Sequence, residues 1–167
     1  MMSWSKSKPL QNSQANTRKR ISTPDEMYDY CEEQGYTVFW YPFDWGIIPS
    51  AAVMDKDGDC FIALDPYQME SAADELCKGM HEAGHCDTGA FYNQYATCDV
   101  RQKAENKADR RAIELVIPEA DYRSAVTAGL TKVWELSEHF GVTPEFMRKA
   151  VCLYTNGNLA VELYAIE

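Results

Sequence analysis

The stretch "KGMHEAGHCDTG", residues 78–89, decides how the rest of the chain is interpreted. It contains His81, Glu82 and His85 in the spacing HExxH. Residues four apart share one face of an α-helix, so the two histidines can bind a single metal ion together. Glu82 projects about 100° away from His81, where a carboxylate beside the ion can accept a proton from water. The stretch therefore predicts a zinc-binding helix that carries its own general base.

A catalytic zinc ion needs a third protein ligand and one open position. The downstream segment "KAENKADRRAIELVIP", residues 103–118, has the pattern of a helix and contains Glu105 and Asp109. These acids are four residues apart and therefore share a face. One of them can reach the metal, while the other holds the far nitrogen of a histidine and fixes its orientation.

Gly84 lies inside the predicted metal helix, where glycine costs about 1 kcal/mol relative to alanine. That cost is understandable if another element passes close to the helix. We therefore expect a close approach at Gly84.

The motif HEAGH at residues 81–85, followed by "ENKAD" at 105–109 and "ELVIP" at 114–118, resembles the ImmA/IrrE family of zinc metallopeptidases. The likeness is specific over about residues 78–118. It implies one Zn²⁺ bound by His81, His85 and Glu105. It also implies Glu82 as the catalytic base and Asp109 as the support of a zinc histidine, an arrangement similar to that of thermolysin-like enzymes.

Two positions depart from the family pattern. Arg111 stands where the family usually has phenylalanine, and "CDTG" after the second histidine lacks the usual aliphatic run. The second departure predicts that the metal helix ends early.

The remaining pattern predicts an α+β fold. A helix should begin after Thr23, with Pro24 at its first position, and end at Gly35. "YTVFWY" has the composition of a strand, and "AAVM" and "CFIAL" form a hairpin around "DKDGD". We expect a small antiparallel sheet packed on a zincin-type HExxH helix that begins at Ser71. One hairpin strand, with "CFIAL" as one candidate, would pair with extended substrate.

We divide the chain into a flexible basic tail at residues 1–20, a metallopeptidase core at 21–118 and a helical region at 119–167. Within the last region, "ELSEHFGVTPEFMRKAVCLY" resembles a helix-turn-helix. Its core positions would be Leu136, Phe140, Val142 and Met147, and "NLAVELYAI" would close the chain as a strand.

Charge and composition exclude several classes of function. The net charge is −10, and residues 1–20 carry five basic residues and no acid, which leaves −15 for the remainder. Such an acidic body disfavours direct nucleic acid binding, despite the resemblance to a helix-turn-helix. No apolar run approaches the ~18 residues that a membrane span needs. Residues 1–20 contain no apolar stretch of the kind found in a secretory signal, so we do not expect export. The six cysteines include no CxxC pair, which disfavours a cysteine-based zinc site. Without an export signal, we expect a cytoplasmic protein whose cysteines are reduced thiols.

The sequence thus predicts a zinc-dependent endopeptidase that hydrolyses a peptide bond in a protein. By resemblance, the substrate would be a cognate helix-turn-helix repressor of a phage or mobile element. A regulatory antirepressor that keeps the fold and acts by binding is the alternative, which an intact Glu82 disfavours. Tyr92, Tyr95, Tyr122 and His139 are candidates for stabilising the oxyanion, although no motif singles out any of them.

Overall fold

The computed structural model describes residues 19–43 and 46–159. Residues 1–18 of the predicted tail and residues 160–166 of the predicted closing strand lie outside the described residues.

The described chain has the expected α+β architecture. Its elements, in order, are α1 (Pro24–Gln34), β1 (Thr37–Trp40), β2 (Ser50–Met54), β3 (Cys60–Leu64), the short 3-10 helix η2 (Pro66–Gln68), α2 (Ala72–Thr88), α3 (Cys98–Val116), α4 (Glu119–Thr127), α5 (Val133–Phe140) and α6 (Pro144–Asn156). The predicted caps of α1 are confirmed, because the Thr23 side chain accepts a hydrogen bond from the Glu26 amide and Gly35 adopts a φ of 79°. Ser71 caps α2 in the same way.

The sheet is mixed, so the prediction of an antiparallel sheet is wrong. Its strand order is β1-β3-β2, in which β2 is antiparallel and β1 parallel to β3. β1 and β2 follow each other in the chain but lie on opposite edges of the sheet. The β2–β3 hairpin then places β3 between them. Because β3 pairs on both sides, "CFIAL" has no free edge for substrate. Among the described strands, β2 is the edge strand next to α2.

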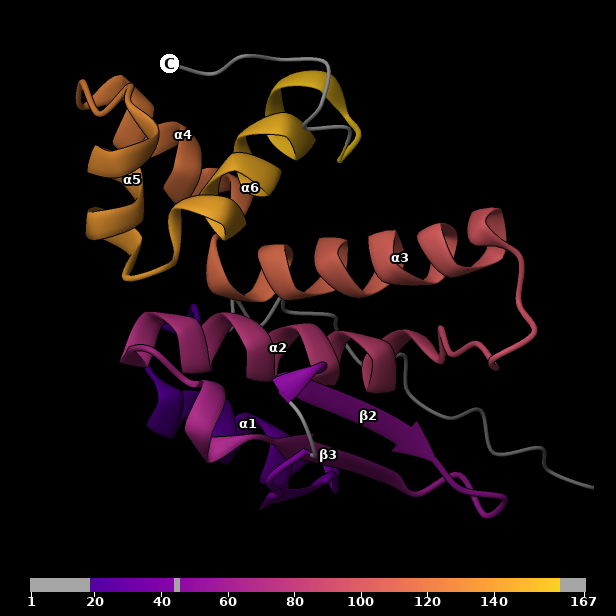
Figure 1. Cartoon of the computed structure of the whole chain (residues 1–167). Helices are drawn as coiled ribbons and strands as arrows, with labels where there is room; N and C mark the ends of the chain where they lie inside the picture. Colours follow the sequence, from indigo (N-terminus) through magenta and orange to yellow (C-terminus); the bar gives the residue numbers. More distant parts are fainter. Residues whose placement is uncertain (1–18, 44–45, 160–167) are drawn as a thin grey trace, which may run out of the picture.

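Helix α2 lies at the centre of the molecule. Figure 1 shows α1 and the sheet on one side of α2, α3 along the other side, and α4–α6 beyond α3. One hydrophobic core runs through these layers, from Met27 and Ile62 through Leu76 and Ile113 to Met147. The four predicted core positions of the helical region, Leu136, Phe140, Val142 and Met147, are all buried.

Helices α2 and α3 approach each other closely at Gly84, as its place in the sequence predicts. A Cβ atom built on Gly84 would lie 2.3 Å from the Ala108 carbonyl oxygen. Only a residue without a side chain permits this spacing, which brings the acids of α3 against the histidines of α2.

The end of the predicted tail contacts the folded body. Arg20 donates hydrogen bonds to the carbonyl oxygens of Val116 and Phe140, and its guanidinium lies over the Phe140 ring. The next amide, of Ile21, donates to the Leu115 carbonyl oxygen. Arg20 therefore joins the end of α3 to the end of α5.

Two predictions about cysteine and helix length are wrong. Cys60 and Cys86 form a disulfide, with Cα atoms 6.0 Å apart, so these two thiols are not reduced. The pair joins β3 to the last turn of α2, which lie 26 residues apart in sequence but pack together in space. Local spacing could not reveal this bond. Helix α2 also includes the first three residues of "CDTG" and ends at Thr88, with Gly89 as its C-cap, rather than ending early.

Candidate metal centre

The two histidines of α2 are oriented by partners on their Nδ1 atoms. His81 Nδ1 donates to Asp109 Oδ1 at 2.8 Å, and His85 Nδ1 donates to the Ala90 carbonyl oxygen at 2.6 Å. With both Nδ1 atoms protonated, the lone pair of each neutral ring is on Nε2. The two Nε2 atoms lie 3.2 Å apart and therefore face a common point.

Glu105 of α3 adds a carboxylate to this point. Its Oε2 lies 2.9 Å from His81 Nε2, and its Oε1 lies 3.5 Å from His85 Nε2. One ligand atom from each of His81, His85 and Glu105 lies within 4.8 Å of the others, so these residues could hold a metal ion. Two imidazoles and one carboxylate with an open side are a donor set suited to a divalent transition metal.

The electrostatics of the cluster favour a cation. Burial disfavours the charged form of His81, but hydrogen bonds to Asp109 and Glu105 outweigh it and raise its pKa to about 10. The same contacts with His81 and His85 hold the pKa of Glu105 well below its usual range. A positive charge is therefore stabilised where the three ligands meet, and a metal ion can replace the proton there.

Asp109 occupies the position expected of a supporting residue. Only 6 % of its surface is exposed, and its two oxygens have separate partners. Oδ1 accepts from His81, while Oδ2 lies 2.9 Å from Lys149 Nζ on α6. Burial raises the pKa of Asp109, but His81 and Lys149 outweigh it, so the carboxyl group is held ionised.

Glu82 lies in the same cleft, beside the histidines. It is buried, and Ser50 Oγ at the start of β2 donates to its Oε1 at 2.6 Å. Burial raises the pKa of Glu82 above its usual value, although His81 and the Ser50 hydrogen bond oppose the shift. A carboxylate whose pKa moves toward neutrality is suited to exchanging protons.

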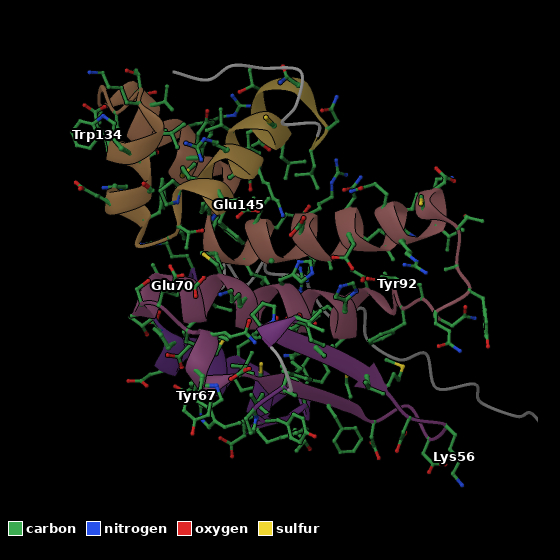
Figure 2. The ribbon with its side chains drawn as sticks, viewed as in Figure 1. Lys56, Tyr67, Glu70, Tyr92, Trp134 and Glu145 are labelled. Carbon is green, nitrogen blue, oxygen red and sulfur yellow. A yellow bond between two sulfur atoms is a disulfide. The ribbon has the colours of Figure 1, made fainter. Side chains whose placement is uncertain are left out.

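The cluster opens into a cleft of about 700 Å³. Ile48 to Ala52 at β2 line one side of this metal cleft, while α3 and the first turns of α6 line the other. Tyr92 lies in the connector between α2 and α3, beside these helices, and Glu145 lies at the start of α6 (Figure 2).

The four oxyanion candidates lie in different places. Tyr92 lines the metal cleft and donates from its hydroxyl to Glu105 Oε1 at 2.7 Å. Tyr95 is 84 % exposed and lines a shallow hollow that adjoins the metal cleft at Phe91 and Tyr92. Tyr122 is buried on α4, and His139 is exposed on α5. Of the four, the structure brings only Tyr92 to the metal cleft.

Sequence reasoning missed two side chains that contact the site's carboxylates, those of Ser50 and Lys149. Each comes from an element far along the chain from its partner, 32 residues for Ser50 and Glu82 and 40 for Lys149 and Asp109. No spacing rule connects residues so distant, so neither could be found without the fold.

No protein-family model matches this chain, and no curated protein matches it. None of the helices in the described part of the chain combines the length and apolar character needed to cross a bilayer.

Proposed function

We propose that this protein is a zinc-dependent endopeptidase. The observation that carries the proposal is the meeting of a three-residue metal cluster, His81, His85 and Glu105, with the buried carboxylate of Glu82 in one cleft. A metal site that served structure alone would be closed by a fourth protein ligand and would not need a proton acceptor beside it.

The donor set supports zinc as the metal. Nε2 of both histidines and the Glu105 carboxylate would hold the ion, with Asp109 and the Ala90 carbonyl keeping the two rings in place. Zinc, when bound, would polarise a substrate carbonyl and lower the pKa of water to about 7.

The chain's own residues would then handle the protons. Glu82 takes a proton from the attacking water and passes it to the nitrogen of the leaving amine. Ser50 holds Oε1 of Glu82, so that the other carboxylate oxygen is free for this exchange. Tyr92, which lines the cleft beside Glu105, is the candidate for donating a hydrogen bond to the developing oxyanion.

The metal cleft suits an extended peptide. β2 is an edge strand, and its residues Ser50 to Ala52 line the cleft, so its free backbone groups can pair with substrate of any sequence. The acidic body favours a basic partner, in keeping with the resemblance-based proposal of a DNA-binding repressor as substrate. Direct binding of nucleic acid is not part of the proposed function.

The test is Glu82→Gln, which keeps the shape of the side chain but removes its basicity. We expect cleavage of a helix-turn-helix repressor encoded beside this gene to fall by about 10²–10⁴-fold, the usual contribution of a general base. Zinc content of the purified protein should stay at one ion per chain. Glu138→Gln makes the same chemical change at an exposed position of α5 and should leave the rate unchanged.

The outcomes separate catalysis from the alternative, a regulatory protein that acts by binding. If Glu82→Gln relieves repression as well as the unaltered protein does, binding is sufficient and the peptidase proposal fails. If the purified protein binds no zinc, the peptidase proposal fails before any cleavage assay is needed.

A further inference from the structure

Helix α6 reaches into the metal centre through Lys149. Its Nζ lies 2.9 Å from Asp109 Oδ2, and Asp109 Oδ1 in turn accepts from His81 Nδ1 at 2.8 Å. The three side chains form a continuous chain from the helical region to a metal ligand, the Lys149–Asp109–His81 chain.

The burial of Asp109 makes this contact consequential. The Asp109 side chain is 9 % exposed and that of Lys149 30 %, so the ion pair lies largely out of water. A buried carboxylate that loses a charged partner is destabilised, because little solvent reaches it to replace that partner. Lys149 supplies Asp109 with a charged partner at the oxygen that His81 does not contact.

The ion pair with Lys149 also restricts how the Asp109 side chain can rotate. A carboxylate with one partner can turn about its side-chain bonds, whereas a carboxylate held at both oxygens has its plane fixed. Partners of this kind set the tautomer and direction of a ligating histidine, and losing one typically costs 10–100-fold in metal affinity.

We propose that Lys149 is a positioning residue for the metal centre, acting through Asp109 and supplied by the helical region. The inference rests on the proposed zinc site, but not on peptide hydrolysis. It assigns α6 a part in metal binding besides its part in lining the metal cleft, where Thr143, Glu145 and Phe146 also lie. A partner that moves α6 would thereby change the geometry of the metal ligands.

The experiment measures zinc affinity by competition with a chromophoric chelator. We expect Lys149→Met to weaken zinc binding by about 10-fold. Lys149→Arg, which keeps the charge, should recover most of that loss. Arg148→Met removes the same charge from the exposed neighbouring position of α6 and should stay within about twofold of the unaltered protein. The visible spectrum of the Co²⁺-loaded protein should shift for Lys149→Met and not for Arg148→Met, because only the first changes a ligand's orientation.

A double-mutant cycle tests whether Lys149 acts through Asp109. Once Asp109→Asn is present, adding Lys149→Met should weaken zinc binding no further. Thermal unfolding without metal checks that each variant folds, and Lys149→Gln takes the place of Lys149→Met if the latter does not.

The results separate the two proposals. An unaltered protein that binds no zinc overturns both. If it binds zinc and Lys149→Met binds equally well, or if the two substitutions weaken binding independently, the role of Lys149 is refuted and the zinc site stands.

Discussion

Gly84→Ala should separate the two halves of the metal centre. The new Cβ would lie 2.3 Å from the Ala108 oxygen, 2.9 Å from its carbonyl carbon and 3.0 Å from its Cα. A carbon and a carbonyl oxygen normally approach no closer than about 3.3 Å, so the shortfall is about 1 Å. The obstacle is the backbone of α3, which cannot rotate away as a side chain can.

The displacement would act directly on the site, because α2 carries His81 and His85 while α3 carries Glu105 and Asp109. The hydrogen bond between His81 and Asp109 is 2.8 Å long. A shift of about 1 Å would lengthen it beyond the reach of a hydrogen bond. We therefore expect zinc affinity to fall by at least 10–100-fold, the usual effect of losing such a partner.

The expected change in stability is smaller. Overpacking costs about 1–3 kcal/mol, and alanine recovers about 1 kcal/mol of helix propensity, so the free energy of unfolding should fall by about 0–2 kcal/mol. The assay combines a zinc competition titration with thermal unfolding of the metal-free protein.

Gly79→Ala is the matched control on the same helix. Its Cβ would meet the Met27 sulfur at 1.9 Å, but Met27 is a flexible side chain of α1, which carries no metal ligand. This variant should lose stability and keep its zinc affinity within about twofold. Undiminished zinc binding in Gly84→Ala, or an equal loss in both variants, would refute the reasoning.

Two further predictions concern stability. If the protein is unfolded without reductant and alkylated, mass spectrometry should find four modified cysteines, because Cys60 and Cys86 are paired; six would contradict the disulfide. Reduction should lower the free energy of unfolding by about 3–4 kcal/mol, given a sequence separation of 26 residues. Hydrogen bonds from Lys19 and Ser22 lower the pKa of Glu26 from 4.5 to about 2, so its contribution is present above pH 4.5 and is lost as the pH falls toward 2. Urea unfolding should therefore show Glu26→Gln less stable than the unaltered protein at pH 6 and nearly equal to it at pH 2; the same difference at both pH values would contradict this.

The sequence was informative where a structure depends on neighbouring residues. The cap at Thr23, the turn at Gly35 and the facing of His81 and His85 all follow from spacings of three to twelve residues, and all appear in the structure. The i, i+4 relation of Glu105 and Asp109 likewise placed both acids on the face that meets α2.

What the sequence could not predict depends on contacts between distant segments. The four residues of β1 contain no information on whether their partner runs parallel, because that direction depends on pairing with β3, a strand more than twenty residues further along the chain. The contacts of Ser50 with Glu82 and of Lys149 with Asp109 could not be predicted for the same reason. Ser50 and Lys149 are ordinary polar residues until the fold brings each to a buried carboxylate.

The two positions that differ from the ImmA/IrrE pattern, which the sequence resembles, contact each other in the structure. Asp87, within "CDTG", has a side chain only 7 % exposed, and Arg111 Nε donates to it at 2.6 Å. The hydroxyl groups of Tyr30 and Tyr36 also donate to Asp87, and burial together with Asp87 raises the pKa of Tyr30 to about 12, which keeps it a donor.

Without Arg111, the buried Asp87 carboxylate would keep only the tyrosine hydrogen bonds, so loss of the arginine should destabilise the protein. Together Asp87 and Arg111 form an ion pair with two added hydrogen bonds from tyrosine hydroxyls, which joins α1, α2 and α3. The ion pair joins the last turn of α2, which extends to Thr88, to α3. That turn carries His85, so Asp87 and Arg111 also support a ligand of the proposed metal site.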